Sequence, residues 1–131
     1  METETLKNAL SYGMVVVDRR GRPLAPGDCV EYWRDLEPGA EESNRPDVVL
    51  GFWFSGDDGS PRVVSGFMIG ERLQLIRLSA SSLVKVGAPS PEYVGRVVAA
   101  ALAEEAEGRQ RYDSLIGFDD LRPPPLEGGP G

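Results

Sequence analysis

The chain has 131 residues, a formal net charge of −7, no histidine and a single cysteine, Cys29. These counts exclude intrachain disulfides, zinc sites built from histidine and cysteine, and catalytic triads that need a histidine base. The sequence contains no apolar run of about 18 residues and begins with the acidic stretch Met-Glu-Thr-Glu, so we expect no membrane span, no signal peptide and a cytoplasmic location.

In chain order, the first region is a short N-terminal segment over residues 1–13. Leu6 and Leu10 stand at i, i+4 spacing, which predicts a helical turn that ends at Gly13. Residues 14–89 then alternate short β-branched and aromatic runs with turns rich in glycine, proline and aspartate. This pattern predicts a 3₁₀ turn over 79–82 and strands over 14–17, 29–34, 48–55, 62–69, 73–78 and 83–86.

The segment 48–55 has the strongest strand signal of the chain. Strict alternation predicts one face with Val48, Leu50, Phe52 and Phe54, and an opposite face with Val49, Gly51, Trp53 and Ser55. Because both sets are largely apolar, we expect both faces to be covered. Cys29 begins the preceding strand, and without a histidine to activate its thiol we expect it to pack as a small apolar residue.

Helix signals replace strand signals over residues 90–108. Ser90 is a good N-cap, Pro91 suits the first helical position, and Gly108 is a stop signal. An apolar stripe at helical spacing is formed by Val94, Val97, Val98, Ala101 and Leu102. Residues 109–131 follow as an extended tail, whose end is too rich in proline and glycine for regular structure.

Together these elements predict a mainly β fold: a small antiparallel barrel of five to six strands over 14–89, followed by one C-terminal α-helix and an extended tail. The turns and strands include Pro26-Gly27-Asp28, Val-Leu-Gly-Phe at 49–52, hairpins at 57–59 and 70–71, and Ser-Ser-Leu-Val-Lys-Val at 81–86. About half of the chain therefore resembles the small barrels of the Tudor and KOW type. The resemblance implies a fold more than a function.

The predicted strands carry six aromatic residues: Tyr32, Trp33, Phe52, Trp53, Phe54 and Phe67. Tudor-type modules bind methylated cations in aromatic cages, so the resemblance implies such a role for some of these rings. The alternative is that the rings fill the core of a small barrel. Trp33 alternates with Tyr32, and Trp53 with Phe52 and Phe54, so one side of each set must point away from the interior. The two tryptophans are the candidates, and an outward tryptophan indicates contact with the helix or with a protein partner.

A second resemblance is carried by Gly27-Asp28, Leu36-Glu37-Pro38-Gly39, Arg45-Pro46 and Val48-Val49-Leu50. These residues resemble the opening of the MazF/PemK-type toxins, which are dimeric barrels that cleave RNA. The resemblance implies a catalytic role for Arg45. The family's catalytic threonine has no counterpart, and Ser65 is the nearest hydroxyl after Arg45 in the expected strand. An endoribonuclease that uses Arg45 is therefore an alternative function.

The tail carries an acidic and hydrophobic cluster that is the preferred element for binding a partner. Its members are Leu115, Ile116, Phe118, Asp119, Asp120 and Leu121. The cluster either docks in a groove with a basic rim on a partner or folds back on its own barrel, and the sequence leaves both outcomes open.

The function predicted on this basis is a non-enzymatic protein-binding or assembly module. The acidic net charge favours a protein partner with a basic surface. A third alternative is a structural subunit of a larger assembly, such as that of a phage or mobile element. In that case the tail and an outward aromatic face make the contacts of a homo-oligomer.

The charge distribution argues against nucleic acid as the partner. Acidic residues outnumber basic ones both up to Ser90 and beyond it, and such a field repels phosphate backbones. The basic run Arg19-Arg20-Gly21-Arg22 is the exception, and its favoured interpretation is a solvated turn. The chain also lacks glycine-rich phosphate loops and the spaced aspartates of a calcium loop, so we expect neither a cofactor nor a metal ion.

Overall fold

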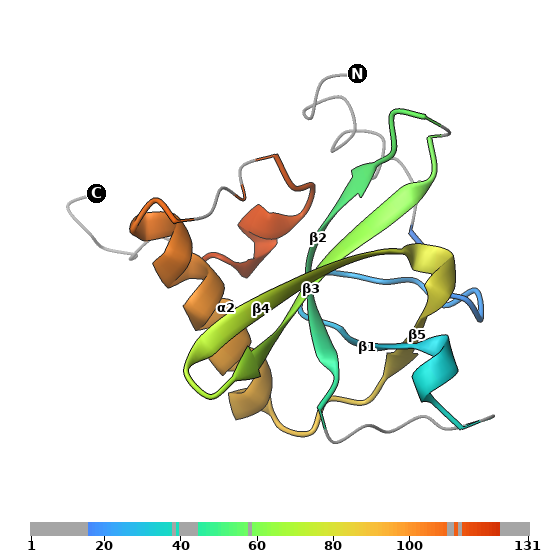
Figure 1. Ribbon diagram of the computed structural model, residues 1–131, viewed down its shortest axis with the longest axis horizontal. Coiled ribbons are helices and arrows are strands. Elements are labelled where there is room, and N and C mark those ends of the chain that lie inside the picture. The colour runs from blue at the N-terminus through green and yellow to red at the C-terminus, as the bar shows by residue number, and fades with distance from the viewer. Residues whose placement is uncertain are drawn as a thin grey trace.

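The computed structural model describes residues 16–37, 39, 45–57, 59–109, 112 and 114–123. In this part of the chain, the sheet is built from β1 (Cys29–Tyr32), β2 (Asp47–Phe54), β3 (Pro61–Ile69), β4 (Arg72–Ser79) and β5 (Leu83–Val86). The other described elements are the 3₁₀ turns η1 (Trp33–Asp35), η2 (Ala80–Ser82) and η3 (Phe118–Leu121), and the helix α2 (Pro91–Ala106) (Figure 1). The prediction of a mainly β fold with one helix after the strands is confirmed. The helical turn expected in residues 1–13 lies outside the described residues.

The five described strands form one antiparallel sheet in the order β4-β3-β2-β1-β5. β4 and β5 are its edges, so the described pairings leave the sheet open where the sequence predicts a closed barrel. The connection between these two strands explains the order. The turn η2 alone joins β4 to β5, and it redirects the chain so that β5 pairs with β1 instead of forming a hairpin with β4.

Two predicted strands are shorter than expected. The strand predicted over 29–34 ends at Tyr32, because the chain turns into η1 at Trp33. The strand predicted over 14–17 is reduced, in its described part, to an isolated bridge between Val17 and Pro23. Proline has no backbone N–H to donate, so it does not extend a ladder.

A β-bulge in β2 changes which side chains share a face. The register of β2 against β3 shifts between Val49 and Gly51, and an extra residue reverses the alternation beyond it. Val48 and Leu50 therefore pack in a core on one face, whereas Phe52 packs in a second core on the other. The strict alternation expected for 48–55 is wrong at this point, although the expectation that both faces are covered is confirmed.

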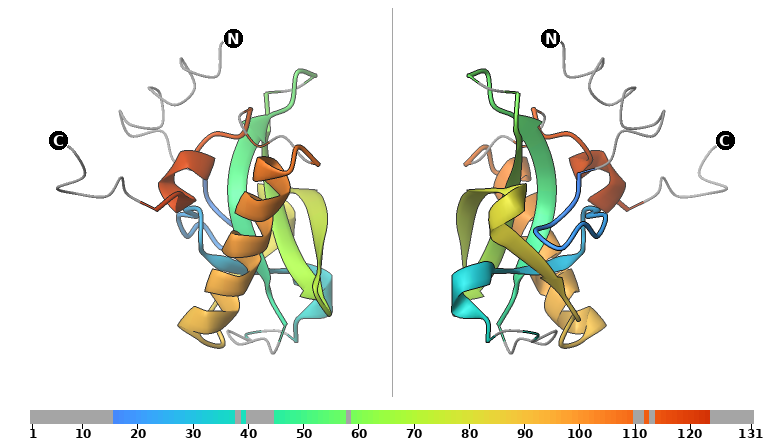
Figure 2. Two further views of the ribbon diagram at one scale, coloured as in Figure 1. Left: turned by 90° about the vertical axis from the view of Figure 1, so that its left-hand side faces the viewer. Right: turned by 90° about the vertical axis from the view of Figure 1, so that its right-hand side faces the viewer.

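The two cores lie on opposite faces of β2. The helix-side core includes Val97 and Ala101 of α2, with Leu50 and Val64 of the sheet. The opposite core is built mainly from Val16, Leu24, Val30, Val63 and Leu83. Figure 2 shows α2 running along one face of the sheet, with η3 beside the C-terminal half of the helix. The helix starts as predicted, because the Ser90 side chain accepts a hydrogen bond from the Tyr93 backbone N–H at 3.1 Å.

The described part of the tail folds onto the sheet instead of extending from it. Tyr112, Ile116 and Phe118 are at most 2% exposed. The backbone of Ile116 exchanges two hydrogen bonds with Phe52, at 2.9 and 3.0 Å, and the rings of Tyr112 and Phe118 stack with centroids 4.6 Å apart. The expectation of an extended tail is therefore wrong for these residues, because burying several large apolar side chains outweighs the entropy of a free chain.

Candidate functional site

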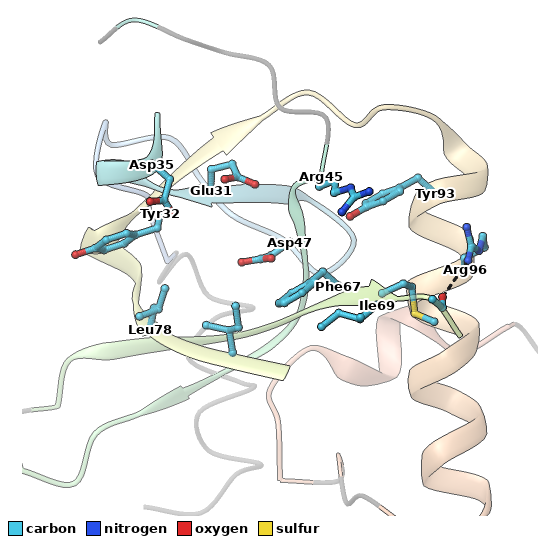
Figure 3. A pocket seen from close by; sticks show the side chains of 13 residues that line it. Glu31, Tyr32, Asp35, Arg45, Asp47, Phe67, Ile69, Leu78, Tyr93 and Arg96 are labelled. Atoms are coloured by element: carbon cyan, nitrogen blue, oxygen red, sulfur yellow. Dashed lines mark hydrogen bonds between the residues drawn. The ribbon is translucent and has the colours of Figure 1, made fainter. Parts of the chain in front are cut away.

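A cleft of about 590 Å³ opens between the end of β1, η1, the start of β2, the β3–β4 hairpin and the first turns of α2 (Figure 3). We call it the acidic cleft, defined by three carboxylates and three rings: Glu31, Asp35, Asp47, Tyr32, Phe67 and Tyr93. Apolar side chains of β3 and β4, together with Arg45 and Arg96, complete the wall. The cleft therefore combines an apolar surface with a small number of charged groups, as ligand-binding hollows commonly do.

Backbone pairing brings the three carboxylates together from two parts of the chain. Asp47, the first residue of β2, pairs in register with Val30 of β1, which places it near Glu31, the next residue along β1. The strand ends one residue later, and η1 turns the chain so that Asp35 also borders the cleft. Figure 3 shows the Asp47 carboxylate in the middle of the cleft, between the β1–η1 wall and the wall formed by β3.

The electrostatic environment of Asp47 is unfavourable for a negative charge. Burial, followed by the nearby charges of Glu31 and Asp35, raises the pKa of its carboxyl to about 7. Asp47 therefore gains or loses its proton near neutral pH. A carboxyl with this property is able to bind a cation when ionised and to transfer a proton when a substrate is in reach.

Two contacts from α2 fix the helix side of the cleft. The Tyr93 hydroxyl donates a hydrogen bond to the Pro46 carbonyl oxygen at 2.6 Å, and Arg96 donates from Nη2 to the Gly70 carbonyl oxygen at 3.5 Å. Burial and the charge of Asp47 raise the pKa of Tyr93, so the hydroxyl remains a donor. Arg45 lies beside Tyr93 on this side, whereas Asp35 and Tyr32 lie on the opposite side (Figure 3).

The two residues of the ribonuclease alternative have different positions. Arg45 is exposed and lines the acidic cleft. Ser65 of β3 is 1% exposed and does not line it, so the structure does not bring the two together at one accessible site. Cys29 is also unsuited to nucleophilic chemistry, because burial and the charges of Asp28 and Asp47 raise its thiol pKa to about 11.

The residues predicted to bind a protein partner lie in different environments, and those of the tail are mostly buried. Leu115, Ile116 and Phe118 are buried in the chain's own cores. The folded-back alternative for the tail is therefore the one that the structure shows. The accessible members of the cluster are Asp119 and Asp120, with Leu121 half-buried.

Trp53 and Trp33 have different environments. Trp53 is half-buried and packs against the helix-side core, on the face opposite to Phe52. The ring of Trp33 lies under the guanidinium groups of Arg19 and Arg34, in a hollow separate from the acidic cleft.

Sequence reasoning did not single out the three carboxylates of the acidic cleft or Tyr93. A partial signal was available, since Glu31 and Asp35 flank the aromatic pair Tyr32-Trp33 at the end of a predicted strand. Nothing local marked Asp47, whose proximity to Glu31 depends on the pairing of β1 with β2.

Among the described residues, no group of three or more Asp, Glu or Cys side chains is arranged to hold a metal ion, and no helix is long and apolar enough to cross a membrane. No protein-family model, curated protein sequence or solved structure matches the chain. The Tudor/KOW and MazF/PemK resemblances therefore stay predictions, and function has to be argued from the site itself.

Proposed function

We propose that this protein is a non-enzymatic binding module that receives a basic side chain of a protein partner in the acidic cleft. The observation that carries the proposal is the convergence of Glu31, Asp35 and Asp47 on one hollow with aromatic walls. Carboxylates supply charge-assisted hydrogen bonds to a guanidinium or ammonium group, and the faces of aromatic rings attract the same cation.

The charges around Asp47 support this assignment. The carboxylates that disfavour a further negative charge at Asp47 equally favour a positive charge beside it. Arg45 and Arg96 lie toward α2 (Figure 3), so the proposed cation site is at the β1–η1 side of the cleft. In the Tudor-type modules that the sequence resembles, aromatic rings bind methylated cations, which adds methylated lysine and arginine to the ligands worth testing.

The test compares two capped tripeptides, Gly-Arg-Gly and Gly-citrulline-Gly, in NMR titrations of the ¹⁵N-labelled protein. Citrulline keeps the shape of arginine but carries no charge. We expect shifts of the amide signals of Glu31, Asp35 and Asp47 with the arginine peptide, and at least tenfold weaker binding of the citrulline peptide. Equal binding of the two peptides would contradict the proposal.

Two variants locate the binding site. Asp47→Asn removes the central carboxylate, and we expect it to weaken binding of the arginine peptide at least fivefold at pH 8. Asp57→Asn is the matched control, because Asp57 is an exposed acid in the β2–β3 turn and does not line the cleft. If both variants bind like the wild type, the acidic cleft is not the site.

One observation favours the ribonuclease alternative: Arg45 and the Asp47 carboxyl, whose pKa is about 7, both line the cleft. The carboxylates there disfavour a phosphodiester, and Ser65 is buried. Incubation of purified protein with a mixed RNA pool separates the two functions. Cleavage by the wild type that disappears in Arg45→Ala would establish the enzyme, whereas intact RNA supports the binding module.

The structural-subunit alternative makes a different prediction about mass. In it, the tail and an outward aromatic face form contacts with a second copy of the chain, so the average mass rises with protein concentration. Light scattering between micromolar and millimolar protein measures this directly. A constant monomer mass excludes the homo-oligomer and leaves a different protein as the partner.

A further inference from the structure

A second hollow, of about 530 Å³, borders η1 and the turn that follows Asp18. Arg19, Arg20 and Arg34 contribute three positive charges to it, and Glu37 contributes the one carboxylate of its described lining. This local excess of positive charge stands out in a chain whose net charge is −7. We call Arg19, Arg20, Trp33 and Arg34 the Trp33 arginine site.

Two guanidinium groups lie against the ring of Trp33. The Cζ atom of Arg19 lies 3.9 Å from the ring centroid, and the Cζ atom of Arg34 lies 5.0 Å from it. Stacking on an indole holds a planar guanidinium in place and leaves its N–H edges exposed. Nη1 of Arg19 donates a hydrogen bond to the Ser81 carbonyl oxygen at 3.4 Å, so a ligand would use the other N–H groups. Two like charges on one ring also repel each other, so an anion bound at their edges relieves that repulsion.

The turn that carries Arg19 and Arg20 is held in a fixed conformation by hydrogen bonds. The carboxylate of Asp18, 3% exposed, accepts hydrogen bonds from the backbone N–H groups of Lys85, Arg22 and Arg20 at 2.7, 2.8 and 2.9 Å. Burial acts to raise the pKa of Asp18, but these N–H groups outweigh burial and hold the pKa below its usual range. A pre-organised turn lowers the entropy cost of binding.

We infer that the Trp33 arginine site binds a phosphorylated side chain of a protein partner. Three arginines and one glutamate leave a charge that matches a phosphomonoester, which carries about −1.5 to −2 at neutral pH. Arginine also forms paired hydrogen bonds to phosphate oxygens. A carboxylate neutralises less of this charge, and the acidic chain as a whole repels a long polyanion such as RNA. This site is separate from the acidic cleft and does not depend on its function.

The experiment uses Trp33 as its own reporter. Trp53→Phe leaves Trp33 as the single tryptophan of the chain, so a change in indole emission reports on the site. In this background the protein is titrated with three capped peptides that differ at one position, Ala-Gly-X-Gly-Ala with X as phosphoserine, glutamate or serine. Sodium chloride at matched ionic strength is the control for screening. We expect a saturable response to phosphoserine, at least fivefold weaker binding of glutamate and no saturable response to serine.

Arginine variants test the named residues. Arg34→Ala in the same background is expected to weaken the phosphopeptide at least fivefold, whereas Arg72→Ala, an exposed arginine of β4 that does not line the hollow, leaves binding unchanged. Arg19→Lys keeps the charge but loses the planar group, and we expect intermediate binding. Circular dichroism confirms that each variant is folded.

Several results overturn the inference. Equal binding of the phosphoserine and serine peptides removes a phosphate site, and equal binding of the phosphoserine and glutamate peptides reassigns the site to carboxylates. Unchanged binding in Arg34→Ala places the ligand elsewhere. An eight-residue oligouridine that binds more tightly than the phosphopeptide, with loss in Arg34→Ala, reassigns the site to nucleic acid.

Discussion

Gly51 of β2 lies directly against Leu115 of the tail. A Cβ atom built at residue 51 stands 2.8 Å from the Cβ atom of Leu115 and 3.1 Å from the carbonyl oxygen of Ile116. Neither of these atoms is the flexible end of a side chain, so neither can move aside easily to make room for a larger residue at this position. The absence of a side chain at 51 is what allows the tail to pair its backbone with β2.

Gly51→Ala is therefore expected to destabilise the protein by about 1–3 kcal/mol through overpacking. Gly95→Ala is the matched control, because an added Cβ there meets nothing within 4 Å and alanine in a helix is favoured by about 1 kcal/mol. Denaturant unfolding of both variants measures the two opposite effects. A Gly51→Ala variant as stable as the wild type would mean that the tail does not occupy this position in solution.

Phe118→Ala tests whether the tail is core. The side chain is 1% exposed and stacked on Tyr112, so truncation is expected to cost about 3–5 kcal/mol. Asp120→Ala, an exposed neighbour in η3, serves as control with an effect below about 0.5 kcal/mol. Thermal melts followed by circular dichroism are sufficient. If Phe118→Ala melts at the same temperature as the wild type, the tail cluster is not part of the core and is accessible to a binding partner.

Asp47→Asn is expected to change how stability depends on pH. The Asp47 carboxyl has a pKa of about 7 in the folded chain and an ordinary value of 3.8, so the unfolded chain loses this proton first as pH rises. Its contribution to stability therefore falls between about pH 4 and pH 7 and stays low above that range.

Asparagine does not ionise, so it removes this loss of stability at higher pH. We expect Asp47→Asn to be more stable than the wild type by about 1–3 kcal/mol at pH 8, and the difference to shrink toward pH 4. Melting curves across this range, with Asp57→Asn as control, give the answer. A difference between Asp47→Asn and the wild type that is the same at both ends of the range contradicts the assignment of the raised pKa to Asp47.

The same titration predicts the pH dependence of ligand binding. Only the ionised form of Asp47 attracts a cation, so affinity for the Gly-Arg-Gly peptide is expected to rise severalfold between pH 6 and pH 8. Asp47→Asn should bind weakly and almost independently of pH over this interval. Isothermal titration calorimetry at three pH values distinguishes the two profiles, and a wild-type affinity that falls with rising pH is incompatible with the proposed cation site.

Local signals in the sequence were sufficient to predict the helix and most of the strands. Ser90 followed by Pro91 marks the start of α2, and β-branched runs between turn residues mark β2 to β5, because caps, turns and propensities act within a few residues. Alternation failed within β2 because of a bulge at Leu50. Gly51 inside the strand is a local signal for such a bulge, but it does not say which residue is the extra one.

The site was harder to predict because it depends on pairings between distant residues. Glu31 and Asp47 become neighbours only through the β1–β2 register, and Arg19 reaches Trp33 only because its turn lies beside β5. The sequence did identify Arg45, Trp33 and the Arg19-Arg20 pair as residues of chemical interest, but it gave no means of assigning Arg45 and the two arginines to different hollows. Net charge likewise averages over the positive and negative surfaces that the fold separates.

The position of β2 between the two cores has a further consequence for how the protein opens. Because the side chains of this strand enter both cores, neither core can be exposed to solvent while the other remains intact. Opening of the helix face and opening of the opposite face therefore share one cooperative unit. In native-state hydrogen exchange, the amides of Val49 and Phe52, which are hydrogen-bonded to Asp28 and Ile116, should exchange only through global unfolding and set the upper limit of protection for the whole chain.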